Sequence, residues 1–256
     1  LMTIFSFMSV GWGQSNTENY TQEIVNISDE EVMIISNYEM EGYTYSDTTY
    51  ISISRLLPPC DDNYTEIDGE CYYLPDLDVL QIFIDNSLET INMDMDIDSS
   101  GVIEPLELGN QYWSDGRITS WYCGGNSHLS GEIPSEIGEL INLTTLSLYN
   151  NSFEGEIPNE IGSLVNLVEL SLGYNFQLTG EIPLSITGLI NLERLYLDNC
   201  SLYGTIPQNI GNLINLEKLR LYGNSLSGGI PNSFYDLINL ELILINGNGF
   251  SGVISN

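Results

Sequence analysis

The chain has 256 residues, and 36 acidic residues against 5 lysines and arginines give it a formal net charge of −31. This charge repels polyphosphates and anionic lipids, which argues against binding to nucleic acid or to a membrane surface. A single histidine and the lack of a glycine-rich phosphate loop leave little equipment for catalysis, so we expect no enzymatic activity. The 42% hydrophobic content is enough for a real core, in one elongated or two small domains.

Residues 1–15 resemble the end of a secretory signal peptide. An apolar run, Ile4–Val10, is followed by small residues two apart in Gly11–Gly13 and then by polar residues. The alternative is a buried strand. We expect a secreted or cell-surface protein whose signal lacks its basic start in this chain. No later stretch reaches about 18 uninterrupted apolar residues, so we expect no transmembrane span.

Residues 16–59 form an acidic region of unknown fold, in which Tyr43, Tyr45, Ile51 and Ile53 hint at strands. A small mixed α/β region is expected over residues 60–117. Its first feature is a pair of cysteines, Cys60 and Cys71, which flank a short polar segment and could close a small disulfide.

The second feature is an amphipathic helix followed by an acidic loop. Apolar residues three or four apart predict a helix over Asp76–Ile91. The next segment, DIDSSGVIEPLE, matches the calcium-loop template, with Gly101 at the sharp turn. The candidate calcium ligands, at positions one, three, five, seven, nine and twelve, are Asp96, Asp98, Ser100, Val102, Glu104 and Glu107.

This segment resembles an EF-hand or dockerin-type loop, and the resemblance implies a structural calcium ion. There is no second loop, although such loops usually come in pairs, and Pro105 lies at the start of the expected exiting helix. The alternative is an acidic, solvated turn that caps a helix.

From Ile118 onward the chain repeats every 24 or 25 residues. The pattern L-x-x-L-x-L-x-x-N-x-L, followed by G-x-I-P and I-G-x-L-x-N-L, is the leucine-rich repeat signature. Each unit is too small to bury its own leucines, so the units must stack. The six aligned leucine-type positions are Ile118, Leu143, Leu167, Leu192, Leu216 and Leu240.

Three other columns recur within the repeats. The asparagines can bond backbone groups of neighbouring coils, the glycines mark a bend that needs backbone freedom, and the prolines fix an extended outer segment. Cys200 replaces the asparagine in the fourth repeat, and we expect Cys123 and Cys200, about 14 Å apart, to be free buried thiols. The asparagine column is Asn126, Asn151, Asn175, Asn224 and Asn248; the glycine column is Gly131, Gly155, Gly180, Gly204, Gly228 and Gly252; the proline column is Pro134, Pro158, Pro183, Pro207 and Pro231.

The G-x-I-P-x-x-I-G-x-L-x-N-L extension makes residues 118–256 resemble the plant-type leucine-rich repeat family. That family includes plant receptor-kinase ectodomains and polygalacturonase inhibitors, and similar repeats occur in secreted bacterial proteins. The resemblance implies a horseshoe or superhelical solenoid with a parallel β-sheet on its concave face, where such proteins bind a protein, peptide or glycan. The pattern stops within a repeat at Asn256, so we expect further repeats to follow.

Strand residues between the buried leucines are expected to point to the concave face. Three of the five basic residues in the chain fall there on adjacent strands, beside tyrosines, which favours an acidic peptide or acidic glycan as ligand. The alternative is a merely solvated strand face on which Glu193 and Glu217 neutralise the cations. The candidate ligand-binding residues are Tyr122, Tyr149, Glu169, Tyr174, Arg194, Tyr196, Asp198, Lys218, Arg220 and Tyr222.

The sequence thus favours a secreted or surface-displayed binding protein that recognises a ligand on its concave face. A second hypothesis is the ectodomain of a receptor whose membrane and kinase parts lie outside this chain. A third is a structural adhesion protein that associates with itself.

Overall fold

The computed structural model describes residues 20–26, 31–40, 43–52, 60–125 and 127–252. The chain divides into two compact units, residues 1–61 and residues 62–256, which are considered separately. The predicted signal segment, residues 1–15, and Asn126 lie outside the described residues.

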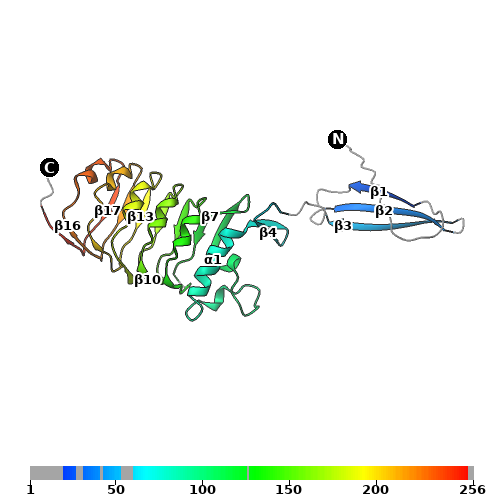
Figure 1. Ribbon diagram of the computed structural model, residues 1–256, viewed down its shortest axis with the longest axis horizontal. Helices are drawn as coiled ribbons and strands as arrows, with labels where there is room; N and C mark the ends of the chain where they lie inside the picture. Colours follow the sequence, from blue (N-terminus) through cyan, green and yellow to red (C-terminus); the bar gives the residue numbers. More distant parts are fainter. Residues whose placement is uncertain (1–19, 27–30, 41–42, 53–59, 126, 253–256) are drawn as a thin grey trace. The chain divides into compact units, whose positions relative to one another are not determined.

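The first unit contains one antiparallel sheet with the strand order β1-β2-β3 (Figure 1). Its strands are β1 (Tyr20–Asn26), β2 (Glu31–Met40) and β3 (Tyr43–Ser52). Tyrosine, threonine, isoleucine and valine are frequent in these segments, and such side chains favour extended backbone.

The second unit is a solenoid in which each repeat contributes one strand to a seven-stranded sheet (Figure 1). All neighbours in this sheet are parallel except β6 and β7, which form an antiparallel pair at one edge. In order, the strands are β6 (Asn110–Ser114), β7 (Arg117–Tyr122), β9 (Thr145–Ser147), β11 (Glu169–Ser171), β13 (Arg194–Tyr196), β15 (Lys218–Arg220) and β17 (Leu242–Leu244). This is the leucine-rich repeat fold with the parallel sheet that the resemblance implied.

After each of the six strands of this sheet from β7 to β17 the described chain forms a second short strand and, in five repeats, a 3₁₀ helix. The short strands are β8 (Ser130–Glu132), β10 (Ser152–Glu156), β12 (Gln177–Thr179), β14 (Tyr203–Gly204), β16 (Ser225–Gly228) and β18 (Gly249–Phe250). The 3₁₀ helices are η4 (Ser135–Glu139), η5 (Asn159–Ser163), η6 (Leu184–Gly188), η7 (Ile210–Asn212) and η8 (Asn232–Asp236). Four of them begin directly after a proline, whose fixed φ suits an extended residue before a helical turn.

The recurring glycines lie where the backbone of each repeat bends beside the previous coil. Gly180 has φ +86°, and a Cβ atom there would lie 2.7 Å from Cγ of Glu156. Both the left-handed backbone and the close neighbour exclude a side chain, as the sequence analysis expected.

Inside the solenoid, asparagine side chains join consecutive coils. The Nδ2 atom of Asn175 donates to the carbonyls of Leu148 (3.1 Å) and Leu172 (2.8 Å), and its Oδ1 accepts from the amide of Phe153 (3.2 Å). Asn151, Asn224 and Asn248 make equivalent bonds. Cys200 occupies this place in the fourth repeat, and its Sγ lies 3.5 Å from the carbonyl of Leu172. The ladder satisfies backbone groups that the short strands leave unpaired in the core.

The helix α1 (Leu74–Asn86) covers the end of the repeat core next to β7. Phe83 meets Trp121 edge to face, with ring centroids 4.9 Å apart, and Phe153 at 5.8 Å. A two-stranded hairpin of β4 (Tyr64–Ile67) and β5 (Glu70–Tyr73) precedes the helix.

The predicted helix over Asp76–Ile91 is wrong at both ends. It starts earlier because Pro75 can occupy a first helical turn. It stops at Asn86 because Ser87 bonds to β8 instead: its Oγ donates to the carbonyl of Ser130 (3.3 Å) and accepts from the Ser130 amide (3.0 Å).

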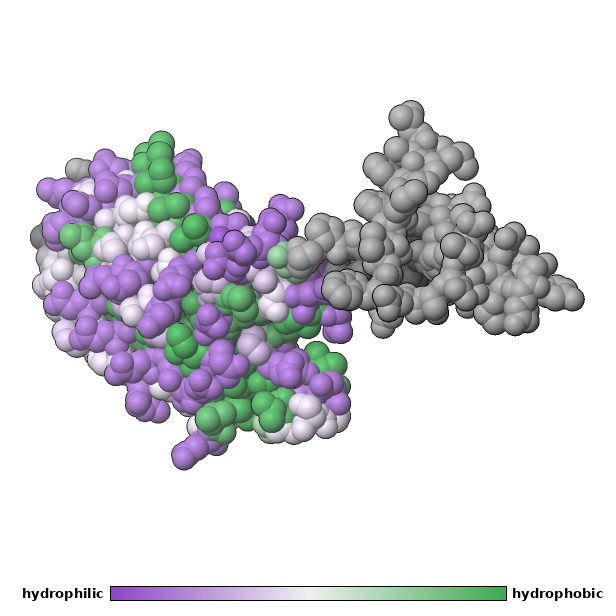
Figure 2. All heavy atoms as spheres, turned by 45° about the vertical axis from the view of Figure 1, so that its right-hand side comes forward, coloured by the Kyte–Doolittle hydropathy of each residue, from purple (hydrophilic) through white to green (hydrophobic). Residues whose placement is uncertain are grey.

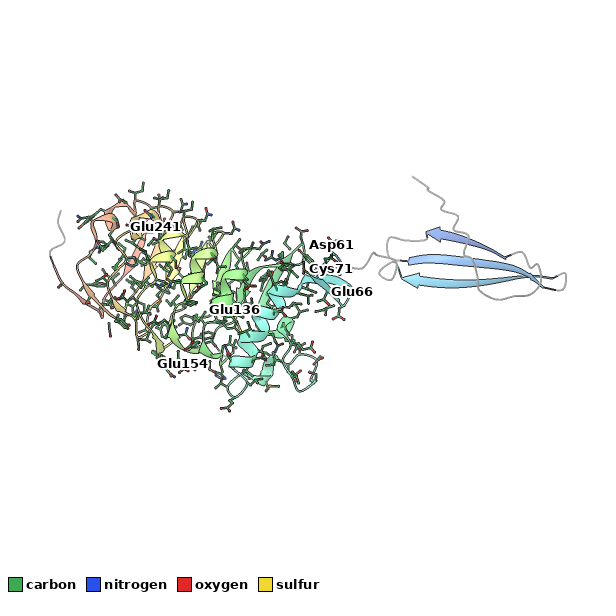
Figure 3. The ribbon with its side chains drawn as sticks, viewed as in Figure 1. Asp61, Glu66, Cys71, Glu136, Glu154 and Glu241 are labelled. Atoms are coloured by element: carbon green, nitrogen blue, oxygen red, sulfur yellow. The ribbon has the colours of Figure 1, made fainter. Side chains whose placement is uncertain are left out.

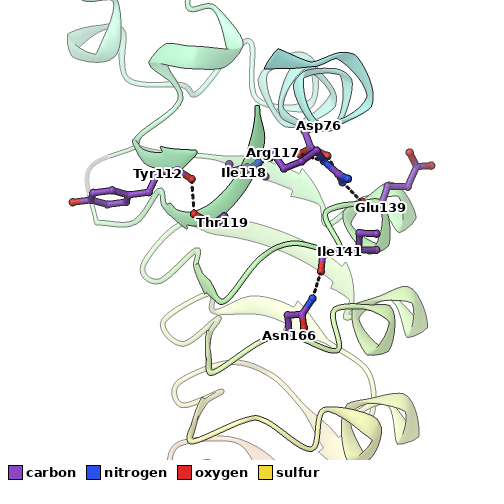
Figure 4. A network of polar contacts seen from close by, with 8 residues as sticks. All are labelled: Asp76, Tyr112, Arg117, Ile118, Thr119, Glu139, Ile141 and Asn166. Carbon is purple, nitrogen blue, oxygen red and sulfur yellow. Dashed lines mark hydrogen bonds and ion pairs between the residues drawn. The ribbon is translucent and has the colours of Figure 1, made fainter. Parts of the chain in front are cut away.

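A buried ion pair ties α1 to the first repeat strand (Figure 4). Asp76 is fully buried and accepts from Nε (2.8 Å) and Nη2 (2.9 Å) of Arg117 and from the amide of Ile118 (3.0 Å). Arg117 also lies over the ring of Tyr73, 4.2 Å from its centroid. The hydrogen bond to Asp76 raises the pKa of Arg117, so the guanidinium stays charged at any physiological pH.

We expect Asp76→Ala to lower the free energy of unfolding by about 3–5 kcal/mol, because it leaves the Arg117 guanidinium and the Ile118 amide without their acceptor. Denaturant unfolding monitored by tryptophan fluorescence measures the change. Asp78→Ala, an exposed aspartate on the same helix, is the control and should stay within about 0.5 kcal/mol of the wild type. Equal losses in both variants would contradict a special role for the buried pair.

We also expect Asn175→Ala to cost about 2–4 kcal/mol of stability, because two buried carbonyls and one buried amide lose their partner. Asn166→Ala provides the matched control, since Asn166 is exposed and its side chain makes a single bond, to the carbonyl of Ile141 (2.9 Å, Figure 4). The same unfolding measurement should give less than about 1 kcal/mol for this control. A small loss for Asn175→Ala would show that the coils do not depend on the ladder.

Candidate ligand-binding face

One face of the seven-stranded sheet carries the side chains that alternate with the buried leucines. The strand centres Trp121, Leu146, Leu170, Leu195 and Leu219 are buried, so the residues on either side of each centre point to the opposite face. We call this the sheet face. Its registered columns are Ser120, Thr145, Glu169, Arg194, Lys218 and Leu242, and Tyr122, Ser147, Ser171, Tyr196, Arg220 and Leu244.

The structure brings the predicted ligand-binding residues together on this face or at its rim. Tyr122, Glu169, Arg194, Tyr196, Lys218 and Arg220 lie on the strands. The other four predicted residues lie two or three positions after the ends of β9, β11, β13 and β15; they are Tyr149, Tyr174, Asp198 and Tyr222. Backbone hydrogen bonds continue between repeats there, such as the bond from Tyr174 N to Asp198 O at 2.7 Å.

The three predicted cations differ in their pairing. Arg194 forms ion pairs with Glu169 (3.4 Å) and Glu193 (3.3 Å), so its charge is neutralised. The pairing with Glu193 is the one expected if the strand face is merely solvated. Among the described residues, Lys218 and Arg220 form no ion pair. The guanidinium of Arg220 lies over the ring of Tyr196, 4.5 Å from its centroid, and its Nε is buried without a hydrogen-bond partner.

Three tyrosines are linked beside Arg220. The rings of Tyr149 and Tyr174 lie 5.0 Å apart, and the hydroxyls of Tyr174 and Tyr222 are hydrogen-bonded at 2.9 Å. The bond to Tyr174, burial and the nearby Asp198 carboxylate all raise the pKa of Tyr222. Burial likewise raises the pKa of Tyr149 and of Tyr196. Tyr149, Tyr196 and Tyr222 are therefore neutral and can donate and accept hydrogen bonds at physiological pH.

Asp198 is buried in the middle of this group. Only 1% of the residue is exposed, its Oδ1 has no hydrogen-bond partner in the described part of the chain, and its Oδ2 lies 3.5 Å from Nδ2 of Asn199. The carboxylate lies against Gly173, where a Cβ atom would be 3.0 Å from Oδ1. Asp198 was predicted to lie on this face, but its burial was not predicted. The equivalent residue of the preceding repeat is Gly173, and its missing side chain was the sequence signal for a buried neighbour.

A groove of about 590 Å³ runs along the edge of the sheet just before the strands. It is lined by the repeated residues Asn166, Val168, Asn191, Glu193, Asn215, Glu217, Asn239 and Glu241. The asparagine side chains donate to carbonyls of the preceding repeat, for example Asn191 to Val165 at 2.9 Å. The glutamates make this edge of the sheet face acidic, so the uncommitted cations of Lys218 and Arg220 stand out against it.

The acidic loop brings three of its predicted calcium ligands together. Carboxylate oxygens of Asp96, Asp98 and Glu107 lie within 4.8 Å of one another. The Ser100 amide donates to Asp98 (2.8 Å), which lowers the pKa of that carboxyl, and the Gly101 amide donates to Asp96 (2.8 Å). Two further predicted calcium ligands are uncharged: the Ser100 hydroxyl donates a hydrogen bond to the Val102 carbonyl (3.0 Å).

The helix expected before this loop is present as α1 but ends at Asn86, and a 3₁₀ turn replaces the helix expected after the loop. A 3₁₀ turn, η2 (Met93–Met95), precedes it and another, η3 (Pro105–Glu107), follows it. The exit is short because Gly109, with φ +72°, turns the chain into β6. Glu104 is not part of the carboxylate group but precedes η3. An all-oxygen donor set still suits a hard cation such as calcium.

The four cysteines fall into two classes. Cys60 and Cys71 are disulfide-bonded, and Cys71 lies on β5 (Figure 3). Cys123 and Cys200 are free and buried, as predicted, and burial raises the pKa of each thiol to about 11. Such thiols are protonated and unreactive at neutral pH.

Hydrophilic side chains cover most of the solenoid face seen in Figure 2, with apolar side chains scattered between them.

His128 is exposed, with φ +55°. Among the described residues, no helix has the length and apolar character needed to cross a membrane.

Comparison with known proteins agrees with this architecture. A profile of the leucine-rich repeat region family matches residues 122–246. A search of curated protein sequences finds no match. Several solved structures are similar, and all of those considered below contain leucine-rich repeat receptors of plants.

The plant peptide hormone receptor RGFR1, solved in complex with RGF2, is 40% identical, with a TM-score of 0.52 over 54% of this chain and 22% of the receptor chain. The ectodomain of the Arabidopsis receptor kinase HAESA, in complex with an extended IDA peptide hormone, is 32% identical, with a TM-score of 0.57 over 69% of this chain and 30% of that chain. The ectodomain of the Arabidopsis receptor kinase SOBIR1 is 28% identical, with a TM-score of 0.55 over 70% of this chain and 96% of that chain.

The chain thus spans about a quarter of the length of the long peptide-hormone receptors that it resembles, 22% for RGFR1 and 30% for HAESA. The matched region holds the repeated strands, the asparagine ladder and the prolines described above. The repeat region of this protein consists of leucine-rich repeats of the plant receptor type.

Proposed function

We propose that the repeat unit is an extracellular recognition module that binds a peptide or protein segment on its sheet face, without catalysis. The observation that carries this proposal is Arg220, a cation held over Tyr196 with a buried Nε and no acceptor. A buried donor without a partner is costly unless a ligand supplies the acceptor. Stacked arginine and tyrosine are also the residue types most enriched at binding hot spots.

The partner that best fits Arg220 and Lys218 carries an acidic group. These cations lie on the same strand, two residues apart, and point to the same face. The surrounding negative charge repels acidic ligands elsewhere on the molecule, so such a ligand is directed to this pair. RGFR1 and HAESA were solved with peptide hormones, which supports a peptide rather than a glycan as the occupant.

A receptor ectodomain is the protein context that we favour, because the similar structures are receptor ectodomains. A self-associating adhesion protein is the competing context. Sedimentation velocity separates the two, because the adhesion hypothesis requires concentration-dependent association of the purified chain.

The binding proposal predicts that Arg220→Ala weakens the affinity for any peptide selected from an acidic peptide array by about 10- to 100-fold, since the ligand loses a charged partner in a desolvated site. Arg194→Ala removes the same charge from a neighbouring strand, but that arginine is already paired with Glu169 and Glu193. Titration by fluorescence anisotropy should show little change for this control. An equal loss of affinity in both variants would show that Arg220 does not mark the binding site. Selective binding of acidic glycans in a parallel array would show that the ligand is a sugar and not a peptide.

We also propose that the acidic loop holds a structural calcium ion through Asp96, Asp98 and Glu107, with Ser100 and Val102 as further oxygen donors. The convergence of the three carboxylates supports this proposal. Like charges held this close repel one another unless a cation or hydrogen bonds compensate them. A bound calcium ion would supply that positive charge and fasten the segment between α1 and β6.

Calcium at about 100 times its dissociation constant should raise the melting temperature by about 5–10 °C relative to chelator. Glu107→Gln should abolish this difference, because it removes one carboxylate from the group. Glu104→Gln is the control and should retain the difference, since Glu104 lies outside the group. Calorimetry in calcium and in EDTA measures the effect, and identical melting curves of the wild-type protein would refute the site.

A further inference from the structure

Asp198 has the properties of a ligand group rather than of a core residue. It is 1% exposed, yet its Oδ1 has no hydrogen-bond partner among the described residues. Its Oδ2 lies 3.5 Å from Nδ2 of Asn199, and the carboxylate lies close enough to the Tyr222 hydroxyl to raise the pKa of that tyrosine. Arg220 does not compensate it, because no ion pair between them exists within 4 Å among the described residues. Burying a charge without a partner is among the most costly arrangements in a protein.

A second, independent feature lies beside it. The third residue after each of β7, β9, β11, β13, β15 and β17 adopts left-handed backbone, and it is glycine or asparagine everywhere except at Tyr174. The six residues are Gly125, Asn150, Tyr174, Asn199, Gly223 and Gly247, and Tyr174 has φ +58°. A bulky side chain is strained in this region, and strain of this kind persists mainly at functional sites.

The strained tyrosine reaches across the repeat that contains Asp198. Tyr174 follows β11 and Tyr222 follows β15, so the 2.9 Å bond between their hydroxyls joins the two repeats on either side of Asp198. The ring of Tyr149 packs against Tyr174 at 5.0 Å, and Gly173 leaves room for the carboxylate below. The Asp198 carboxylate thus interacts with the Tyr222 hydroxyl, which is bonded to the hydroxyl of Tyr174, among aromatic rings.

We propose that Asp198, Tyr174 and Tyr222 form a binding site for an alkylammonium group of the bound peptide. An ammonium group has three donors on one nitrogen and no acceptor, which matches three oxygens converging from three repeats. Tyrosine rings attract a cation through their π faces, and the charge of −31 raises the local concentration of cations. A planar guanidinium is best matched by a bidentate carboxylate, whereas this group offers one free carboxylate oxygen and two separate hydroxyls.

The inference rests on the proposed function and sharpens it. Arg220 offers a donor and Asp198 an acceptor on neighbouring repeats, whose strands lie about 4.8 Å apart. The preferred peptide therefore carries an acidic group and an ammonium group close together. The ammonium group comes either from a lysine side chain or from a free amino terminus.

The test is a positional-scanning peptide array with one fixed residue per position, made in free and in N-acetylated form. We expect the wild type to prefer lysine at one position, or the free amino terminus, at least tenfold over norleucine or acetyl, and to prefer lysine over arginine. Asp198→Asn should remove this preference. Glu154→Gln is the control and should retain the preference. It removes the same charge from β10, which belongs to a different sheet (β12-β10-β8) from the one that carries the sheet face.

Retention of the preference in Asp198→Asn, or its equal loss in Glu154→Gln, would overturn the inference. Peptides bound without any preference for an ammonium group would also overturn it and leave the recognition module intact. If no peptide binds, both proposals fail together. Tyr222→Phe removes one phenolic oxygen without charge and should weaken the preference several-fold, which keeps the test valid if Asp198→Asn folds poorly.

Thermal unfolding separates this site from a structural role. Because one buried oxygen of the carboxylate has no partner in the described structure, Asp198→Asn should leave the melting temperature unchanged or raise it by about 2–4 °C. Tyr174→Asn should raise it as well, since asparagine tolerates left-handed backbone. A marked fall in both variants would show that Asp198 and Tyr174 serve the fold.

Discussion

Every repeat of this protein depends on its neighbours, because no single coil can cover its own leucines. The buried centres of β9, β11, β13 and β15 stack directly on one another, so each leucine is enclosed by the coils before and after it. Short strands leave many backbone groups facing inward, and the asparagine ladder satisfies them. Stacking and the ladder together hold the strands in register, and that register places side chains 24 or 25 residues apart side by side on the sheet face.

An unsupported coil at the start of such a stack would expose its core, and α1 prevents this. Phe83 fills the space against Trp121, while Asp76 receives three hydrogen bonds from the beginning of β7. The antiparallel strand β6 also extends the sheet on this side, so the edge of β7 is paired. The acidic loop is part of the same end, since it links α1 to β6. A cation bound there would stabilise the end of the solenoid and not the sheet face itself.

The period of the repeats made the fold and the sheet-face columns predictable from sequence, because a fixed spacing forces equivalent residues into equivalent places. Contacts between different columns were not predictable in this way. The pairing of Arg194 with Glu169 and Glu193 depends on side-chain rotamers, as does the hydroxyl bond that joins Tyr174 to Tyr222. The length of α1 depended on Ser87, whose partner Ser130 lies 43 residues away. Tyr174 was predicted as a site residue, but its left-handed backbone was not, although the other repeats have glycine or asparagine at that position.

The sheet face differs from the core in how well its polar groups are satisfied. In the core, the ladder leaves each asparagine with two or more partners, and the Asp76 carboxylate has three hydrogen bonds. Three buried side-chain atoms in the described part of the chain have no hydrogen-bond partner: those of Asp198 and Arg220 lie on the sheet face, and Ser185 Oγ lies on η6. Tyr174, also on the sheet face, keeps a strained backbone. A protein that can satisfy buried groups through so regular a ladder has no structural need for these exceptions. The exceptions at Asp198, Arg220 and Tyr174 lie on three adjacent repeats of one face, and a ligand that completes them there would explain their presence.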